Sequence, residues 1–215
     1  MNSLAKHLLE TVILREGSHK SLADGVCVNE AVAWYAGEPH SDRPACECPI
    51  IGQFARNIND SIRSDELRTE LLRPLIPRLA GSKSTRAVET KRGFVAADWA
   101  VRVFLPIALE ADGRRSLAQE LRELPPVVDC CTAYKASEAT EALGAAHFAA
   151  YSASCVDYSA ATSKAAYDWC YAELNNAAFS AACAVQWAAH GDDEKHRRVY
   201  QLAVECIEAM LAVQS

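Results

Sequence analysis

The sequence predicts an all-α protein, and three observations support this fold class. Apolar residues recur at helical spacing in each long segment, whereas no segment alternates with period two over a convincing length. The two Asp-Gly pairs punctuate helical patterns and do not join β-rich runs. From about Ser137 to Gln186, alanine recurs at helical spacing with no proline and almost no glycine. We therefore expect a multi-helix bundle with a long alanine-rich C-terminal helical hairpin or bundle.

The first elements are expected in the N-terminal 37 residues. Ser3 can cap a first helix that ends at Gly17, and this helix would bury Leu4, Leu8, Val12 and Ile13. A second helix is expected to begin near Ser21 or Asp24 and to end at Gly37. The segment from 37 to 48 contains two prolines with Ser and Asp between them, so it cannot continue a helix.

Pro49 fits the first turn of a third helix, because its missing N–H has no helical partner there. The apolar stripe of that helix consists of Ile50, Ile51, Phe54 and Ile58. Ser64 or Asp65 can cap the next helix, which Pro74 and Pro77 should kink or break ahead of Gly81. Its inward-facing residues are Leu67, Leu71, Leu72 and Leu75.

A longer helix is expected from Thr85 to Glu110, and it carries Val88, Val95, Trp99, Arg102 and Val103. Ser116 and Gln119 have the spacing of a capping box for a short helix that ends at the Pro125-Pro126 pair. Core residues before this pair are large and apolar, whereas those after it are chiefly alanine. The change predicts a boundary between an N-terminal helical domain, 1–126, and an alanine-rich helical region, 127–215; the alternative is that both form one continuous domain.

The alanine-rich region should form an antiparallel pair or triplet of helices, broken near Asn175-Asn176 or Gly191. Small side chains allow close approach of helix axes, with Ala146, Ala149, Ala150, Ala153 and Ala160 on or beside the packed face. The last helix is expected from Asp193 to Val213, capped by Asp192 or Asp193. Its stripe consists of Val199, Leu202, Ala203, Cys206, Met210 and Leu211.

Composition restricts the function classes. The chain has 215 residues, half of them hydrophobic, and a net charge of −6, which disfavours nucleic-acid binding. Charged residues interrupt the apolar spacing of the N-terminus, so a signal peptide is not predicted, and no apolar run is long enough to span a membrane. We expect a cytoplasmic protein whose nine cysteines are mostly reduced. Four are expected to be small buried apolar residues: Cys155, Cys170, Cys183 and Cys206.

A dense group of potential ligands lies between residues 27 and 48. Zinc binds Cys sulfur and His nitrogen, so a metal site would use Cys27, His40, Cys46 and Cys48. The Cys-x-Cys spacing is unusual for structural zinc, and no second distant Cys/His pair completes the pattern. Alternatively, Cys46 or Cys48 near a helix start is a thiol nucleophile with His40 as base and Asp42 in the same segment.

A purely structural interpretation of the same segment is also open. Gly37 ends a helix, Pro39 and Pro44 shape a rigid turn, and Asp42 or Ser41 bonds nearby backbone N–H groups. In that interpretation the cysteines only pack, and no cofactor is bound.

Aromatic residues on the alanine-rich helices are candidates for contacts with a partner. Tyr151, Tyr158, Trp169 and Trp187 project from a small-residue surface, where an aromatic side chain can anchor another protein. Packing within the core or between helices is the alternative role for them. Serine-triad, phosphate-loop, dinucleotide and zinc-helix motifs are absent from the sequence.

Several motifs resemble those of one family. The order AGEPHSDRPACECPI, LLRPLIPRL, AADWAVRVF and LPPV is similar to that of uncharacterised helical proteins from actinobacteria, related bacteria and their phages. In those relatives the turn reads AGEPHSDHP, so Arg43 stands where they have a second histidine. The resemblance covers about residues 25–128. It implies the same helical fold and a phage-related origin, and it supplies no activity.

From the sequence we expect a helical protein–protein interaction module, such as an adaptor, scaffold or inhibitor, without catalytic activity. Its partner would be another protein or a second copy of the chain, with a homodimer formed through the alanine helices. The alternative function is a metal- or thiol-dependent enzyme, or a structural zinc protein, that uses His40, Asp42, Cys46 and Cys48.

Overall fold

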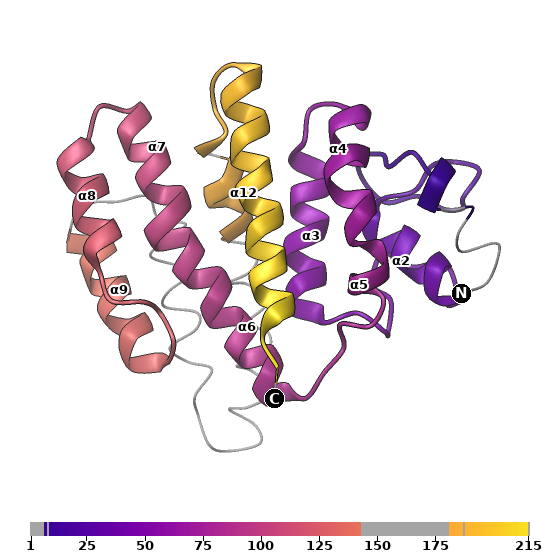
Figure 1. The fold of residues 1–215 in the computed structure, drawn as a ribbon, viewed down its shortest axis with the longest axis horizontal. Coiled ribbons are helices and arrows are strands. Elements are labelled where there is room, and N and C mark those ends of the chain that lie inside the picture. Colours follow the sequence, from indigo (N-terminus) through magenta and orange to yellow (C-terminus); the bar gives the residue numbers. More distant parts are fainter. Residues whose placement is uncertain (1–6, 8, 143–180, 187, 215) are drawn as a thin grey trace.

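A computed structural model describes residues 7, 9–142, 181–186 and 188–214. Every regular element in this part of the chain is a helix, which confirms the all-α prediction. The helices pack side by side, and the C-terminal helix lies in the middle of the view in Figure 1. Among the described helices, none combines the length and apolar character needed to cross a membrane.

The N-terminal segment is helical at residues 9–11 and has no regular secondary structure at residues 12–15, where burial alternates from residue to residue as in an extended chain. The expected helix to Gly17 is therefore wrong over its second half. Successive side chains of an extended chain point in opposite directions, so Val12 and Leu14 are buried while Ile13 is 58% exposed. Hydrogen bonds to other parts of the chain hold this segment in place: Leu14 N–H donates to Thr69 Oγ1 at 2.9 Å, Arg15 N–H donates to Val26 O at 2.9 Å, and Asn59 Nδ2 donates to Arg15 O at 2.8 Å.

The second expected helix begins later than predicted. Helix α2 spans Val28–Ala36, because Asp24 and Gly25 form a turn and Cys27 is the N-cap. Cys27 Sγ accepts the N–H of Glu30, and the Glu30 carboxylate accepts the N–H of Cys27. The helix ends as predicted at Gly37, whose φ of 75° is in the left-handed region that favours glycine.

Helices α3, Pro49–Ser61, and α4, Asp65–Leu72, follow the predictions closely. Pro49 lies in the first turn of α3, and its expected stripe is fully buried. Ser64 caps α4 by accepting the N–H of Leu67. As Pro74 and Pro77 predicted, α4 gives way to a 3-10 turn, η1 (Arg73–Leu75), and then to the short α5 (Ile76–Leu79).

The predicted long helix is present, but a wider turn interrupts it. Thr85 caps α6 (Arg86–Trp99), a π-helical turn η2 covers Ala100–Phe104, and α7 covers Leu105–Ala111. Pro106 is the second residue of α7; it has no N–H for a helical bond, and its ring would clash with the carbonyl four residues earlier, which belongs to η2. A π turn relieves that conflict without ending the helix.

Helix α8, Arg115–Glu123, ends before Pro125 as expected, but its predicted capping box is wrong. The N-cap position is Arg114, which makes no side-chain cap bond, so Ser116 is already inside the helix. Helix α9, Cys130–Ala142, begins after Asp129, whose carboxylate accepts the N–H of Thr132 at 2.8 Å.

The C-terminal helix α12, Asp193–Ala212, is capped by Asp192 as predicted, and a break near Gly191 is also confirmed. Of its expected stripe, Leu202 and Leu211 are only partly buried, while the other four residues are buried. Helix α12 packs against α3, α4 and α6. The division of the chain at residue 126 stays a prediction.

Several predictions fall outside the described residues. They concern the close alanine face, the break near Asn175-Asn176, and Tyr151, Tyr158, Trp169, Trp187, Cys155 and Cys170. Of the remaining predicted cysteines, Cys206 is buried as expected, whereas Cys183 is partly exposed.

Candidate functional site

The four predicted metal ligands have other contacts in the structure. Cys27 caps α2, Cys48 is the buried residue that precedes α3, and Cys46 is half-buried between them. His40 Nε2 lies 2.9 Å from the carbonyl oxygen of His19. Within the described part of the chain, no three His, Cys, Asp or Glu side chains gather as a metal site requires. Zinc binding stays a prediction.

The thiols of this segment are poor nucleophiles. Burial raises the pKa of Cys27 to about 12 and that of Cys46 to about 11, and it also raises the pKa of Cys48. A catalytic cysteine needs the opposite direction, because the thiolate is the reactive form. The geometry therefore gives no support to the thiol-enzyme alternative.

The turn from Gly37 to Pro49 is ordered by an acid that the sequence analysis had not assigned to this role. The Glu38 carboxylate accepts the N–H groups of Ala45 and Cys46, at 2.6 and 2.9 Å. Ser41 bonds a backbone donor as predicted, since its Oγ accepts the N–H of Arg43 at 3.0 Å. Asp42 takes part through its carbonyl oxygen, which accepts a hydrogen bond from Arg56 Nη1 at 2.6 Å.

One buried carboxylate, Glu30, joins the first loop to α2. It accepts three hydrogen bonds: His19 N–H at 2.6 Å, His19 Nδ1 at 2.9 Å and Cys27 N–H at 2.8 Å. Burial acts to raise its pKa, but the bonds from His19 and Cys27 outweigh burial, and the pKa lies below its usual value. Glu30 is therefore an ionised structural anchor.

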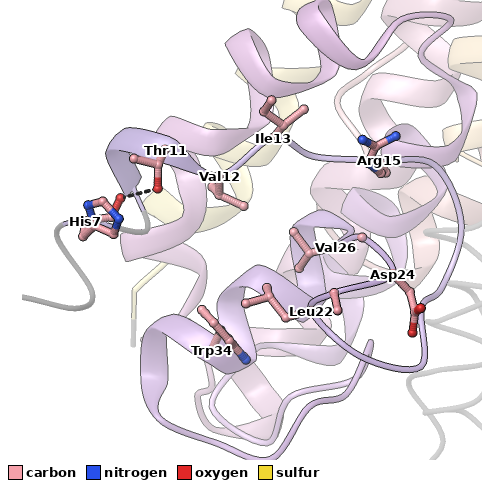
Figure 2. Close-up of a pocket in the computed structure, with 11 residues that line it drawn as sticks. His7, Thr11, Val12, Ile13, Arg15, Leu22, Asp24, Val26 and Trp34 are labelled. Atoms are coloured by element: carbon pink, nitrogen blue, oxygen red, sulfur yellow. Dashed lines mark hydrogen bonds between the residues drawn. The ribbon is translucent and has the colours of Figure 1, made fainter.

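An apolar pocket of about 520 Å³ lies beside this anchor, between the extended segment 12–15, the loop 22–26 and α2. In Figure 2, Ile13 is at the upper edge and Trp34 at the lower edge, with Val12, Leu22 and Val26 between them. The side chains of Arg15 and Asp24 add charge at its right-hand end.

Two large apolar side chains at this pocket remain in contact with solvent. Ile13 is 58% exposed and Trp34 is 36% exposed. The sequence analysis missed the pocket because it placed Ile13 on the buried face of a helix. Val12, Ile13 and Leu14 are three consecutive apolar residues, so no alternation in the sequence marked Ile13 as outward-facing.

Comparisons with protein families, curated proteins and solved structures gave no match to this chain. The resemblance to the actinobacterial and phage family stays a prediction. The site must therefore be interpreted from its own geometry.

Proposed function

We propose that this protein is a helical protein–protein interaction module and that its docking surface is the apolar pocket bordered by Ile13 and Trp34. The observation that carries the proposal is the exposure of these two side chains at the rim of a pocket of about 520 Å³. Burying them against a partner would release ordered water, and aromatic residues in such positions often contribute most of the binding energy.

The lining indicates the chemistry of the partner segment. Val12, Leu22 and Val26 provide an apolar floor that suits an inserted leucine, isoleucine or phenylalanine side chain. Arg15 and Asp24 carry opposite charges at one end of the pocket, so a polar residue next to the inserted side chain could pair with either. The partner is another protein or a second copy of this chain.

A charge placed at the rim tests the proposal. Ile13→Asp should abolish co-purification of the partner from the source cells, because a carboxylate would replace the apolar contact and would lose its hydration on binding. Val128→Asp is the matched control, since Val128 is 62% exposed and does not line the pocket. Thermal melts of both variants should match the wild type.

A photo-crosslinking aromatic residue in place of Trp34 locates the contact directly. We expect this residue to crosslink to an apolar segment of the partner, which is the protein that co-purifies with the wild type but not with the Ile13→Asp variant. If the partner is a second copy of the chain, the crosslink joins two copies. Light scattering gives the mass and distinguishes a homodimer. Equal retention by Ile13→Asp and wild type would contradict the docking site. Stoichiometric zinc that is lost on His40→Ala or Cys46→Ala would instead support the metal alternative.

A further inference from the structure

A second pocket, of about 290 Å³ and with charged residues on its lining, lies between the 37–48 turn and one face of α3. It shares no residue with the apolar pocket. Its lining consists of Arg43, Pro44, Glu47, Pro49, Gly52, Gln53 and Arg56. Four of these residues belong to α3: Pro49, Gly52, Gln53 and Arg56. They occupy positions i, i+3, i+4 and i+7, which lie on the same helix face.

Glu47 is the unusual member of this lining, because it is an acid with only 3% of its surface exposed. Asn29 Nδ2 donates a hydrogen bond to its Oε2 at 2.7 Å. Its Oε1 has no hydrogen-bond partner among the described residues. Buried polar atoms are seldom left without a partner, since each such atom costs free energy. The pocket therefore has an acid on its lining with one enclosed oxygen that no described protein group satisfies.

Gly52 makes the position of Glu47 possible. A Cβ atom at residue 52 would lie 2.6 Å from Glu47 Oε2 and 3.1 Å from Asn29 Nδ2. The carboxyl group thus rests directly against the backbone of α3, where any larger residue would displace it.

Two arginines supply positive charge to the same pocket. Arg56 is held in place because its Nη1 donates to Asp42 O at 2.6 Å and its Nη2 donates to Gln53 Oε1 at 2.7 Å. Arg43 is exposed at the turn. Guanidinium groups match the geometry of carboxylate and phosphate oxygens, and they stay charged at every physiological pH.

Burial raises the pKa of Glu47 to about 8, so this carboxyl carries a proton at neutral pH. The charge of Arg56 acts to lower the pKa of Glu47, and the charge of Glu38 acts to raise it. Arg43 and the Cys46 thiol lie in the same turn as Glu47. The pocket then has two positive charges and no negative one on its lining. Such a lining attracts an anion and repels a cation.

We propose that this pocket binds a small oxyanion, with Arg43 and Arg56 pairing with its charge and protonated Glu47 donating a hydrogen bond from Oε1. The volume suits a molecule of a few carbon atoms. A carboxylate and a phosphate offer the same oxygens, so both groups fit this chemistry. The site is independent of the docking function proposed for the apolar pocket.

Calorimetric titration of the full chain with succinate and with inorganic phosphate tests the proposal, with the uncharged diamide succinamide as control. We expect heat of binding from at least one anion at pH 7 and none from succinamide; the anion that binds identifies the group. For succinate, affinity should fall about tenfold between pH 7 and pH 9, because a carboxyl with a pKa of about 8 loses its proton in that range.

Variants assign the effect to named residues. Glu47→Gln keeps a neutral donor at this position, so its affinity at pH 9 should equal its affinity at pH 7. Arg43→Gln changes only an exposed side chain and should weaken binding at least about tenfold. Arg115→Gln on α8, another exposed arginine, should leave affinity unchanged.

Three results would overturn the proposal. The first is no heat from either anion at millimolar concentration with the folded wild type. The second is equal binding of succinamide and succinate. The third is an unchanged affinity in Arg43→Gln, which would place the bound anion elsewhere on the surface.

Discussion

Glu30 and Glu47 are two glutamates with nearly equal burial, 1% and 3% exposed, and their pKa values move in opposite directions. Glu30 accepts three hydrogen bonds and its pKa is lowered. Glu47 accepts one hydrogen bond, from Asn29, and its pKa is raised by burial. Similar exposure hides a difference in depth: Glu47 lies deeper within the protein and receives fewer donors, so desolvation prevails there, whereas at Glu30 the hydrogen bonds prevail.

The difference separates two roles. Glu30 is satisfied from within the fold and holds the first loop to α2. Glu47 keeps an unused oxygen on an acid that lines a pocket, as expected for a group that serves a ligand. The predictions below test this contrast.

The largest expected effect is the pH dependence of stability. The folded pKa of Glu47, about 8, exceeds its usual 4.5, so its contribution to stability is full below about pH 4.5 and is lost as pH rises through 8. Relative to Glu47→Gln, the wild type should lose several kcal/mol of unfolding free energy across that range. Glu30 acts in the opposite sense, since its contribution is lost as pH falls through its lowered pKa. Urea denaturation from pH 4 to pH 9 measures the effect of Glu47, and an extension of the series below pH 4 measures that of Glu30; a constant difference between wild type and Glu47→Gln would contradict the assignment.

Removal of the two carboxyls should have unequal costs. Glu30→Ala leaves three donors without their acceptor, so it should lower the free energy of unfolding by at least about 3 kcal/mol. Glu47→Gln should be at least as stable as the wild type at pH 7, because the unfolded wild type gains free energy there by ionising Glu47 and the glutamine variant does not. Equal losses in urea denaturation at pH 7 would show that the donor count does not distinguish the two sites.

Gly52→Ala should destabilise by about 1–3 kcal/mol, because the new methyl group overlaps Glu47 Oε2. Gly81→Ala is the matched control: its Cβ would meet nothing within 4 Å, and the change should stay within about 0.5 kcal/mol. The loss at Gly52 should shrink when Glu47→Ala is present, since the overlapping atoms are gone. Additive losses in this double-mutant cycle would mean that the helix itself, and not the carboxyl, requires glycine.

The smallest effects are expected in the turn that carries Glu47. Glu38→Ala frees the N–H groups of Ala45 and Cys46 and should cost about 1 kcal/mol. Asp42→Ala keeps the carbonyl that Arg56 contacts and should cost less than about 0.5 kcal/mol. Thermal melts compare the two variants; a larger loss for Asp42→Ala would restore the role that the sequence suggested for its side chain.

Local signals were predicted well from the sequence. Ser64 and Asp192 mark helix starts through hydrogen bonds within one turn, Pro49 marks one by its position in the first turn, and Pro74 and Pro77 break a helix through their own rings. These effects depend on neighbours only three or four positions away, so the sequence contains them fully.

Contacts between distant segments were not predictable in the same way. The sequence analysis recognised the polar density of residues 27–48 but interpreted it as a ligand set. The donors of Glu30 include His19, and the partner of Glu47 is Asn29, 18 positions away. Helix α2 begins later than predicted, and Ser116 does not cap α8, for a related reason. Turns at Gly25 and Gly113 precede the two helices, so each helix begins at a different residue from the one that the sequence indicated.

Arg92 joins three parts of the molecule that are far apart along the chain. Its guanidinium donates to Ser82 O in the loop after α5, at 2.5 Å, and to Met210 O and Val213 O at the end of α12, at 3.1 and 3.5 Å. The last turn of α12 therefore cannot unwind unless the buried guanidinium of Arg92 loses its hydrogen bonds to that turn. Amide hydrogen exchange at the two segments should be correlated, so that they open and close as one cooperative unit.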